Sequence, residues 1–372
     1  MLRLCSPQLG ISPDTNSGGE VYDREVLKSL AKLGVKIEII LPKNRSYEKS
    51  IKNWSVTHLP IKTIFPPYIF NLFLIPYLFK VFKKSKFQIL RVHSPYFVGP
   101  AALAFRFFKK NIPVVASYLH LENKNIIFTF IDKLLIDKFD HIITISQATK
   151  KEIINKHAFP EERITVTYPG IDPKFKPTTK DKKLLKKFNL NNKKIVLYLG
   201  GLKFRKNVSF LLDLVKDLDS NAALLICGEG NAKLFLTLKA LFLGISDRVE
   251  FTGYIPEDKK VDFYNLCDVF LVPSKKEGFG MISVEAQACG KPVLVSDSSS
   301  LSETLIDGKT GFICKAGDKI NWLEKLTILI RDDNLREIMG KRAQEFVQSQ
   351  FSWKKSAQKQ KEIFEKLVSQ NA

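Results

Sequence analysis

The feature that most constrains the fold is a regular alternation of short apolar runs and longer amphipathic segments along the 372 residues. The apolar runs predict strands, and the segments between them carry the apolar spacing of helices. Such alternation is typical of parallel sheets, because a chain must cross over, usually through a helix, before it can add a parallel strand. In the first half, strands are expected at residues 2–5, 35–41, 87–92, 114–117, 141–146 and 164–168.

The alternation starts again in the second half, with strands expected at residues 195–199, 224–227, 249–251, 269–272 and 293–295. Three helical segments follow Asp318, and the last begins near Ser352. A chain of this length is too long for one ordinary hydrophobic core. We therefore predict an α/β protein of two similar domains, each with a parallel sheet, and a cleft between them.

The junction between the halves lies in residues 169–173 (PGIDP), which a polar, lysine-rich stretch follows to about Lys194. Proline, glycine and the change in composition together indicate a linker. We expect an N-terminal domain at residues 1–172 and a second domain at residues 173–351. Residues 352–372 are expected to form a helix that packs back towards the N-terminal domain.

The charge of the chain restricts its partners. The formal net charge is +21, from 59 Lys and Arg against 38 Asp and Glu. Such an excess suits an anionic partner, which can be nucleic acid, a phosphorylated small molecule or an acidic membrane. Lysines occur along the whole chain, and no DNA- or RNA-binding signature accompanies them. We therefore expect a dispersed basic surface and no specific nucleic-acid partner.

The cysteines and the N-terminus both favour a cytoplasmic protein. The cysteines are odd in number and widely spaced, and no pair has metal-ligand spacing; they are Cys5, Cys227, Cys267, Cys289 and Cys314. Buried thiols in a reducing compartment are the natural interpretation. Residues 1–10 lack the long apolar core of a secretory signal.

Residues 64–82 form an apolar run of membrane-span length. Three prolines and Asn71 interrupt it, so a true span is the least favoured of three interpretations. A core helix with a solvated basic end is favoured. The alternative is an aromatic face that rests on an acidic membrane, with a basic cluster of Lys80, Lys83, Lys84 and Lys86.

Residues 269–297 carry the strongest functional signal, because they read as strand, loop, helix and strand. Ligands of doubly wound sheets bind outside the carboxyl ends of the strands, where the loop at 275–280 must lie. Free amides at the helix start, beside Gly278 and Gly280, can hold a diphosphate. Glu277 and Glu285 suit hydrogen bonds to sugar or ribose hydroxyls, although either alone is also explained as a solvated charge or a helix-dipole partner.

With these residues the sequence resembles the retaining glycosyltransferases of family 4, whose fold is two facing Rossmann-like doubly wound domains (the GT-B fold). The family signature is a Glu, seven residues and a second Glu, in an EGFG context followed by EAxAxGxPV. Here residues 277–280 read EGFG and residues 285–293 read EAQACGKPV. The resemblance covers nearly the whole chain and includes residues 16–20 (NSGGE), 141–146 (HIITIS), 168–172 (YPGID), 253–256 (GYIP) and 351–353 (FSW).

The resemblance implies roles for the matching residues. Glu285 would bind the donor ribose, and Glu277 the transferred sugar. Gly18 and Gly19 would bring the N-terminal backbone close to the donor phosphates. The other donor-binding groups implied are Ile255, beside the nucleobase, and the backbone amides of Gly278, Phe279, Gly280, Met281 and Ile282, at the sugar and the diphosphate.

A second loop, residues 198–207 (YLGGLKFRKN), adds positive charge. The family has an Arg directly after the first Gly and a Lys five residues later, and both neutralise the diphosphate leaving group. Lys206 matches this Lys, but Gly201 occupies the Arg position in the donor site. We expect Arg205 or Lys203 to supply the missing charge. The alternative is an ordinary basic surface loop.

Two histidines follow strands expected in the N-terminal half. In the family, a His after the strand at 114–117 faces the transferred sugar, and His120 is the approximate match. His120 is therefore assigned to the active site, whereas His93, after the preceding strand, has a weaker claim. Either residue taken alone is also explained as a structural hydrogen-bonding group.

The resemblance implies transfer of a sugar from a nucleoside diphosphate sugar, such as a UDP-sugar or GDP-mannose, to a hydroxyl acceptor with retention. The departing phosphate oxygen would take the proton of the acceptor. No cofactor and no divalent metal are expected, and residues 217–219 (DLD) are interpreted as a solvated helix end. The acceptor is expected to be a lipid-linked or cell-surface polysaccharide, reached from the inner face of the membrane.

Two alternatives remain. A catalytically silent, anion-binding GT-B protein is favoured only by Gly201. An NAD-dependent oxidoreductase ranks lower, because neither the glycines at 200–201 nor those at 228–230 open a full G-x-G-x-x-G.

Overall fold

The computed structural model describes residues 1–15, 17–62, 69–120, 130 and 133–371. The contacts within the chain divide it into two compact units. Unit 1 consists of Met1–Gly170 together with Ser352–Ala372, and unit 2 is Ile171–Phe351.

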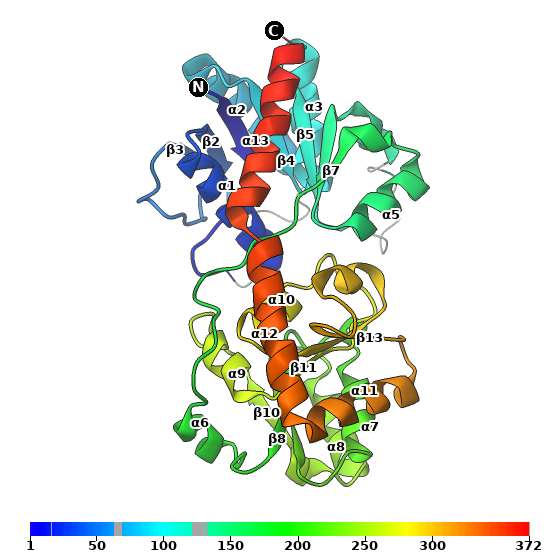
Figure 1. The fold of residues 1–372 in the computed structure, drawn as a ribbon. Coiled ribbons are helices and arrows are strands. Elements are labelled where there is room, and N and C mark those ends of the chain that lie inside the picture. Colours follow the sequence, from blue (N-terminus) through cyan, green and yellow to red (C-terminus); the bar gives the residue numbers. More distant parts are fainter. Residues whose placement is uncertain (16, 63–68, 121–129, 131–132, 372) are drawn as a thin grey trace. The chain divides into compact units, whose positions relative to one another are not determined.

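Unit 1 is built on a parallel sheet with the strand order β3-β2-β1-β4-β5-β6-β7 (Figure 1). Its strands are β1 (Arg3–Pro7), β2 (Lys36–Leu41), β3 (Trp54–His58), β4 (Ile89–His93), β5 (Val114–Tyr118), β6 (His141–Thr144) and β7 (Ile164–Val166). All six strands predicted for this half are present. Strand β3 was not predicted, because its sequence, WSVTH, lies at the sheet edge, where its side chains are half-buried or exposed and need no apolar run.

Helices cover the sheet of unit 1. They are α1 (Gly18–Lys32), α2 (Phe70–Ser85), α3 (Pro95–Phe108), α5 (Gln147–His157) and α13 (Trp353–Gln370), with short 3₁₀ turns at Ile136–Lys138 and Glu161–Arg163. The last helix lies along α1 in Figure 1, and Gln360 on α13 donates a hydrogen bond of 3.1 Å to the hydroxyl of Tyr22 on α1. Helices α2 and α3 pack together through aromatic rings, such as Phe79 against Phe105 at 4.9 Å between centroids.

Unit 2 repeats this architecture with the strand order β10-β9-β8-β11-β12-β13. Its strands are β8 (Lys194–Leu199), β9 (Ala222–Cys227), β10 (Val249–Gly253), β11 (Val269–Val272), β12 (Val293–Ser296) and β13 (Gly311–Cys314), and all of them pair in parallel. The five predicted strands are present. Strand β13 was missed because it is only four residues long and begins with a glycine.

The helices of unit 2 follow its strands in turn. They are α6 (Lys182–Lys187), α7 (Val208–Lys216), α8 (Lys233–Phe242), α9 (Lys260–Leu266), α10 (Met281–Ala288), α11 (Lys319–Arg331) and α12 (Asp333–Gln350), with 3₁₀ turns at Phe204–Lys206, Ser246–Arg248 and Ser299–Thr304. Their apolar faces and the strands enclose a core that includes Leu211, Leu224 and Trp322.

The strand order places a switch point in each sheet. In both sheets the first strand of the unit lies beside the fourth. From β1 the next strands are added towards β3, and from β4 they are added towards β7, at the opposite edge of the sheet. In unit 2 the same reversal lies between β8 and β11. At such a switch point, the loops leaving two neighbouring strands diverge and open a crevice at the carboxyl edge. The topology therefore selects two places for ligands, beyond β1 and β4 in unit 1 and beyond β8 and β11 in unit 2.

The apolar run at residues 64–82 contributes residues 70–82 of α2, while residues 63–68 lie outside the described part of the chain. Leu74, Leu78 and Val81 are buried in the core of unit 1, but Leu72 is 72% exposed. Among the described residues, no helix has both the length and the apolar character needed to cross a membrane.

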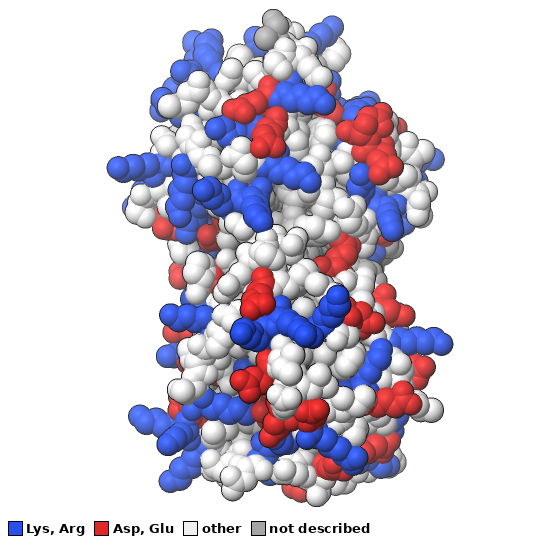
Figure 2. All heavy atoms as spheres, in the orientation of Figure 1, with Lys and Arg blue, Asp and Glu red and all other residues white. Residues whose placement is uncertain are grey.

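On the face drawn in Figure 2 the surface charge is dispersed, as expected from the spread of lysines. Figure 2 shows Lys and Arg over both units on the face drawn, with Asp and Glu among them. The cysteines are buried as free thiols, which agrees with the sequence interpretation. Burial raises the pKa of Cys227 and of Cys267 to about 12, so these thiols stay protonated.

Candidate active site

The loop after β8 begins with a close backbone crossing. The Cβ that any other residue would carry at Gly228 would lie 1.9 Å from the carbonyl oxygen of Gly200, so only glycine lets the loops after β8 and β9 meet. The hydroxyl of Tyr198 donates a hydrogen bond of 3.1 Å to the carbonyl oxygen of Gly201. Burial, and then the negative charge of Glu277, raise the pKa of Tyr198, so this phenol remains a donor. These contacts fix the start of the loop after β8, on the amino-terminal side of Arg205 and Lys206.

Lys206 and Glu277 meet at the switch point of unit 2. Lys206 follows β8 and Glu277 follows β11, and their side chains form an ion pair and hydrogen bond between Nζ and Oε1. Both side chains are largely buried. The neighbouring strands β8 and β11 thus place one cation and one carboxylate at the same switch point.

Arg205 joins this pair from the same 3₁₀ turn. Its NH1 donates a hydrogen bond of 3.1 Å to the carbonyl oxygen of Lys276 and lies 3.9 Å from Oε2 of Glu277. The backbone of Arg205 in turn accepts a hydrogen bond of 3.0 Å from the amide of Lys275. The basic turn and the loop before α10 therefore hold each other in place.

The loop at Gly278–Gly280 turns sharply into α10. Gly280 has a φ of 101°, and a Cβ there would lie 2.5 Å from Cδ2 of Leu301, so the position requires glycine for two reasons. The hydroxyl of Ser300 donates a hydrogen bond of 3.1 Å to the carbonyl oxygen of Glu277. Among the described residues, no side chain caps the start of α10, although the amide of Ser283 donates a hydrogen bond of 2.9 Å to the carbonyl oxygen of Gly280. The amides of Met281 and Ile282 are therefore available to an anion, which the partial positive charge of a helix start also attracts.

Glu285 lies inside α10 and is only 6% exposed. Its Oε2 accepts a hydrogen bond of 2.7 Å from the hydroxyl of Tyr264 on α9, and it lies 3.8 Å from Nζ of Lys260. Burial opposes the charge of Lys260, but Glu285 and Glu257 outweigh it and raise the pKa of this lysine. Sequence reasoning missed Tyr264 and Lys260, because nothing in the sequence relates positions on α9 to a residue on α10.

Residues 180–346 match the family described as Glycosyl transferases group 1, and residues 16–175 match Glycosyltransferase Family 4. An uncharacterized glycosyltransferase of Methanocaldococcus jannaschii is 30% identical over 352 residues, which is 88% of each chain. The chain belongs to the family 4 glycosyltransferases. This confirms the resemblance on which the assignment of site residues rests, and the protein is a glycosyltransferase.

Solved structures show the fold of this glycosyltransferase. Sucrose-phosphate synthase from Thermosynechococcus elongatus matches with a TM-score of 0.85 and 19% identity over 100% of both chains. HepE from Anabaena, in complex with UDP and glucose, matches with a TM-score of 0.79 and 19% identity over 98% of this chain and 100% of its own. The predicted GT-B fold of two Rossmann-like domains is confirmed.

A shorter match is the capsular polysaccharide biosynthesis glycosyltransferase CapM of Staphylococcus aureus, which is 30% identical over 238 residues. This match covers 62% of each chain.

The remaining assigned residues of the glycosyltransferase divide between the units. In unit 2, Ile255 is buried between β10 and α9, and Gly201 is exposed on the loop after β8. In unit 1, Gly18 and Gly19 begin α1, and His120 is exposed just beyond β5. Asn16 lies outside the described residues. The structure therefore brings Lys206, Arg205 and Glu277 together, and it places the glycines and His120 at the carboxyl edge of the other sheet.

The Asp-x-Asp sequence follows the end of α7. Asp217 pairs with Lys319 at 2.6 Å, and Asp219 pairs with Arg331 at 3.2 Å. Both cations belong to α11. The two carboxylates thus take part in ion pairs between α7 and α11 rather than converging on one point.

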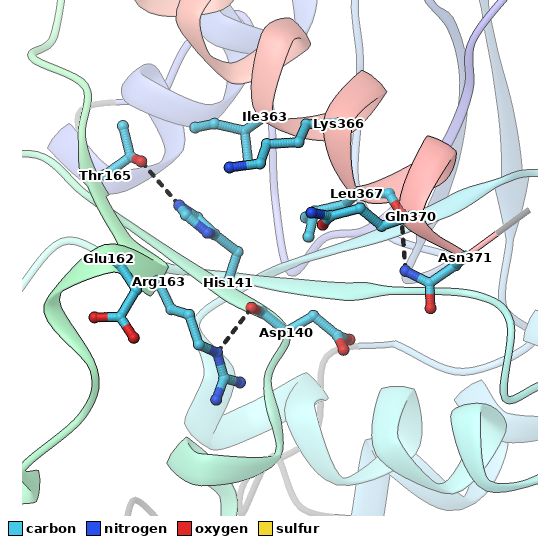
Figure 3. A pocket seen from close by; sticks show the side chains of 10 residues that line it. All are labelled: Asp140, His141, Glu162, Arg163, Thr165, Ile363, Lys366, Leu367, Gln370 and Asn371. Atoms are coloured by element: carbon cyan, nitrogen blue, oxygen red, sulfur yellow. Dashed lines mark hydrogen bonds between the residues drawn. The ribbon is translucent and has the colours of Figure 1, made fainter.

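A cavity of about 600 Å³ in unit 1 lies away from these residues (Figure 3). His141 and Thr165, at the starts of β6 and β7, share a hydrogen bond of 2.8 Å there, and Lys366 of α13 faces them. Because the strands are parallel, this is the amino-terminal edge of the sheet, opposite the edge where ligands bind. Burial, then Arg163 and Lys366, lower the pKa of His141 to about 4.

Proposed function

We propose that this glycosyltransferase transfers a sugar from a nucleoside diphosphate sugar to a hydroxyl acceptor with retention of the anomeric configuration. The observation that carries the proposal is the arrangement at the switch point of unit 2. There Lys206 and Arg205 contact Glu277, and Glu285 lies farther along the helix that starts beside them. Cations, free helix amides and two carboxylates are the groups that a diphosphate joined to two sugars requires.

Glu285 suits the ribose of the donor. Tyr264 occupies its Oε2, and within the described part of the chain its Oε1 has no hydrogen-bond partner. A ribose presents neighbouring hydroxyl donors, which a carboxylate accepts strongly. Ile255, buried just after β10, would lie beside the base. HepE from Anabaena has been solved in complex with UDP and with UDP-glucose, which supports a nucleotide sugar as the donor here.

Lys206 and Arg205 suit the leaving group. The bond between the anomeric carbon and the diphosphate breaks as negative charge develops on the phosphate oxygen, and a cation already in place stabilises that charge. One well-placed group of this kind contributes about 3–4 kcal/mol to lowering the barrier. We therefore propose that no divalent metal and no other cofactor is required. Glu277 would hold hydroxyls of the transferred sugar once the donor phosphate draws Lys206 away from it.

The anomeric configuration would be retained because the acceptor attacks the anomeric carbon from the same face that the diphosphate leaves. The acceptor oxygen would bond to the anomeric carbon, and its proton would pass to the departing phosphate oxygen. This route needs no separate acid and base pair in the protein, unlike glycoside hydrolysis.

The acceptor is proposed to be a lipid-linked or cell-surface glycan. The names of two relatives support a glycan or polyol acceptor: CapM of capsular polysaccharide biosynthesis, and a D-inositol 3-phosphate glycosyltransferase of Corynebacterium jeikeium. Unit 1 also has a surface that suits an anionic membrane. Leu72 and Phe73 on α2 and Phe107 and Phe108 on α3 are exposed, and α2 ends in Lys80, Lys83 and Lys84.

The membrane contact is tested with vesicles. We expect binding to anionic but not to neutral liposomes at low salt, and weaker binding after Lys83→Glu with Lys84→Glu. Lys182→Glu with Lys183→Glu on α6 is the matched control. Equal binding by both double variants would rule out this surface.

The donor is tested with UDP-, GDP- and ADP-sugars in the presence of a chelator. We expect one donor to bind and to be hydrolysed slowly by wild type, and Glu285→Ala and Lys206→Ala to abolish both effects. If no nucleotide sugar binds, the loss of the Arg at Gly201 has silenced the site, and the anion-binding alternative replaces this proposal. Binding of NAD(P) in the same assay would instead favour the oxidoreductase.

A further inference from the structure

Helix α8 is apolar on both of its faces. Residues 233–242 read KLFLTLKALF, and the helix packs beside α7 in unit 2 (Figure 1). Leu236 and Ala240 are buried in the core of the unit. A surface helix normally turns charged and polar residues to the solvent, and a helix that is apolar all round is normally buried. The outer face of α8 therefore has the composition of a buried surface.

The outer face presents large side chains to the solvent. Five of them lie on α8: Leu234, Phe235, Leu238, Leu241 and Phe242. Phe204, in the 3₁₀ turn after β8, joins them, because its ring lies 6.1 Å from that of Phe235 between centroids. The exposed fraction of these six residues lies between 48% and 89%. We call this patch the α8 face, and a contiguous apolar patch of this kind marks an interaction surface.

The spacing on the α8 face suits a second helix. Leu234, Leu238 and Leu241 lie four and three residues apart, and Phe235, Leu238 and Phe242 lie three and four apart. Residues at these distances are neighbours on one side of a helix. The same spacing is typical of helices that pack into an apolar groove. Leu238 belongs to both rows and therefore lies at the centre of the face.

The charge of α8 distinguishes between the possible occupants. Its two lysines are paired within the chain, Lys233 with Glu229 at 3.1 Å and Lys239 with Asp213 at 2.6 Å. The helix is therefore close to neutral, although the chain has a net charge of +21. An anionic membrane or a nucleic acid is attracted by unpaired cations. A second copy of this basic chain is instead repelled, except where the local charge is balanced, as it is along α8.

The extent of the α8 face also matches a dimer. A standard interface buries about 800 Å² per partner and is enriched in aromatic residues. Large aromatic side chains bury about 150–250 Å² each, so three phenylalanines and three leucines supply an area of that order. We propose that the α8 face is the interface of a symmetric homodimer, in which α8 of one copy packs against α8 of the other. Under two-fold symmetry the same patch meets itself, so one self-complementary face is sufficient.

The oligomeric state of the full chain tests the proposal, by sedimentation velocity over a range of protein concentrations. We expect wild type to sediment as a dimer of the 42.4 kDa chain. Leu238→Glu with Leu241→Glu sets like charges against each other and should weaken association by on the order of 100-fold or more. The matched control is Ile320→Glu with Ile328→Glu on α11, at two exposed apolar positions of the same unit, and should leave the dimer intact.

A mixture of oppositely charged variants shows whether the same faces meet. Leu238→Lys with Leu241→Lys should be monomeric by itself, as the glutamate variant is. Mixed together, the two variants should form heterodimers, because opposite charges then face each other across the two-fold axis. The mixture also controls for misfolding, since a variant that had lost its fold would not regain association in this way.

The remaining outcomes overturn the proposal. A wild type that stays monomeric at every concentration excludes the dimer, and a glutamate variant that still dimerises places the interface elsewhere. Failure of the two variants to associate excludes the symmetric arrangement. If wild type is monomeric and binds liposomes, and the glutamate variant does not bind them, the α8 face contacts a membrane instead. The dimer does not depend on the proposed sugar transfer, so either can fail alone.

Discussion

The hydroxyl of Tyr264 donates a hydrogen bond of 2.7 Å to Oε2 of Glu285, and both side chains are buried. Burial, and then the charge of Glu285, raise the pKa of Tyr264 far enough that the phenol remains a donor. A carboxylate removed from water in this way needs a fixed donor, since an unpaired buried charge is strongly destabilising. The phenol therefore both stabilises Glu285 and orients its other oxygen before a substrate arrives.

Tyr264→Phe tests this preorganisation. The change removes one hydrogen bond to a charged group and leaves the ring packing, so we expect the free energy of unfolding to fall by about 1.5–3 kcal/mol. Donor affinity should fall by roughly tenfold, because Glu285 becomes free to rotate. Calorimetry of donor binding and chemical unfolding measure the two effects. A variant that binds the donor as wild type does would show that Glu285 needs no orientation.

Lys206→Met tests the leaving-group role. We expect the transfer rate to fall by about 10²- to 10³-fold, because the cation would stabilise charge that develops only as the diphosphate leaves. Glu277→Gln is the informative partner, since it keeps Lys206 and should preserve nucleoside diphosphate affinity while slowing transfer. Steady-state kinetics on both variants, with wild type under chelator, measure this. A small loss of rate in Lys206→Met would contradict the proposal.

Arg205 is expected to replace the family Arg that is absent at Gly201. Its guanidinium already lies 3.9 Å from Glu277, whereas Lys203 is exposed. We expect Arg205→Ala to slow transfer by about tenfold or more and Lys203→Ala to have little effect. Introducing Gly201→Arg into the Arg205→Ala protein should restore the rate.

There is room for that rescue. Of the residues that the structure describes, those nearest to a Cβ at Gly201 are Glu229, with its carbonyl oxygen at 3.9 Å, and Lys203, with Cε at 4.0 Å. Transfer rates of the single and double variants, measured side by side, decide the question. A stronger effect of Lys203→Ala than of Arg205→Ala would reverse the assignment.

His141 should make unit 1 sensitive to acid. Burial, then Arg163 and Lys366, lower its pKa from an ordinary 6.5 to about 4. The unfolded chain therefore binds the proton more tightly, and stability is lost as the pH falls from about 6.5 towards 4. We expect His141→Gln to flatten this part of the profile, measured as unfolding temperature against pH, whereas His58→Gln should not. A slope that survives His141→Gln would place the acid sensitivity elsewhere.

Much of the proposed donor site could be assigned from the sequence because its residues are local. Glu277, Gly278, Gly280 and Glu285 occupy one strand–loop–helix segment, and the backbone path of that segment fixes their relative places. Lys206 was assigned by its match to the family Lys in the loop after β8, but its ion pair with Glu277 depends on the pairing of β8 with β11. Sequence order alone gives no reason for these two strands to be neighbours.

The strands missed by sequence reasoning have a common physical cause. Strand β3 is a partly exposed edge strand, and β13 is short and starts with Gly311. Neither needs a continuous apolar run, and such a run is the pattern by which buried strands are recognised. Their pairing with β2 and β12 supplies the stability that their own composition lacks.

The sequence by itself, through its alternation of strands and helices and its resemblance to a known family, determined that this protein is an α/β glycosyltransferase of two Rossmann-like domains, and it indicated which motifs are proposed to bind the donor. The spacing of apolar residues and the positions of glycines are local properties of the sequence, so they can be recognised without knowledge of the fold. Only the tertiary structure brought Asp23, Arg91 and His93 together with Gln360, and Tyr264 with Glu285. These contacts join separate helices and strands. Polar groups that are buried between such elements need hydrogen-bond or ion-pair partners, and only the tertiary structure shows which residues supply them.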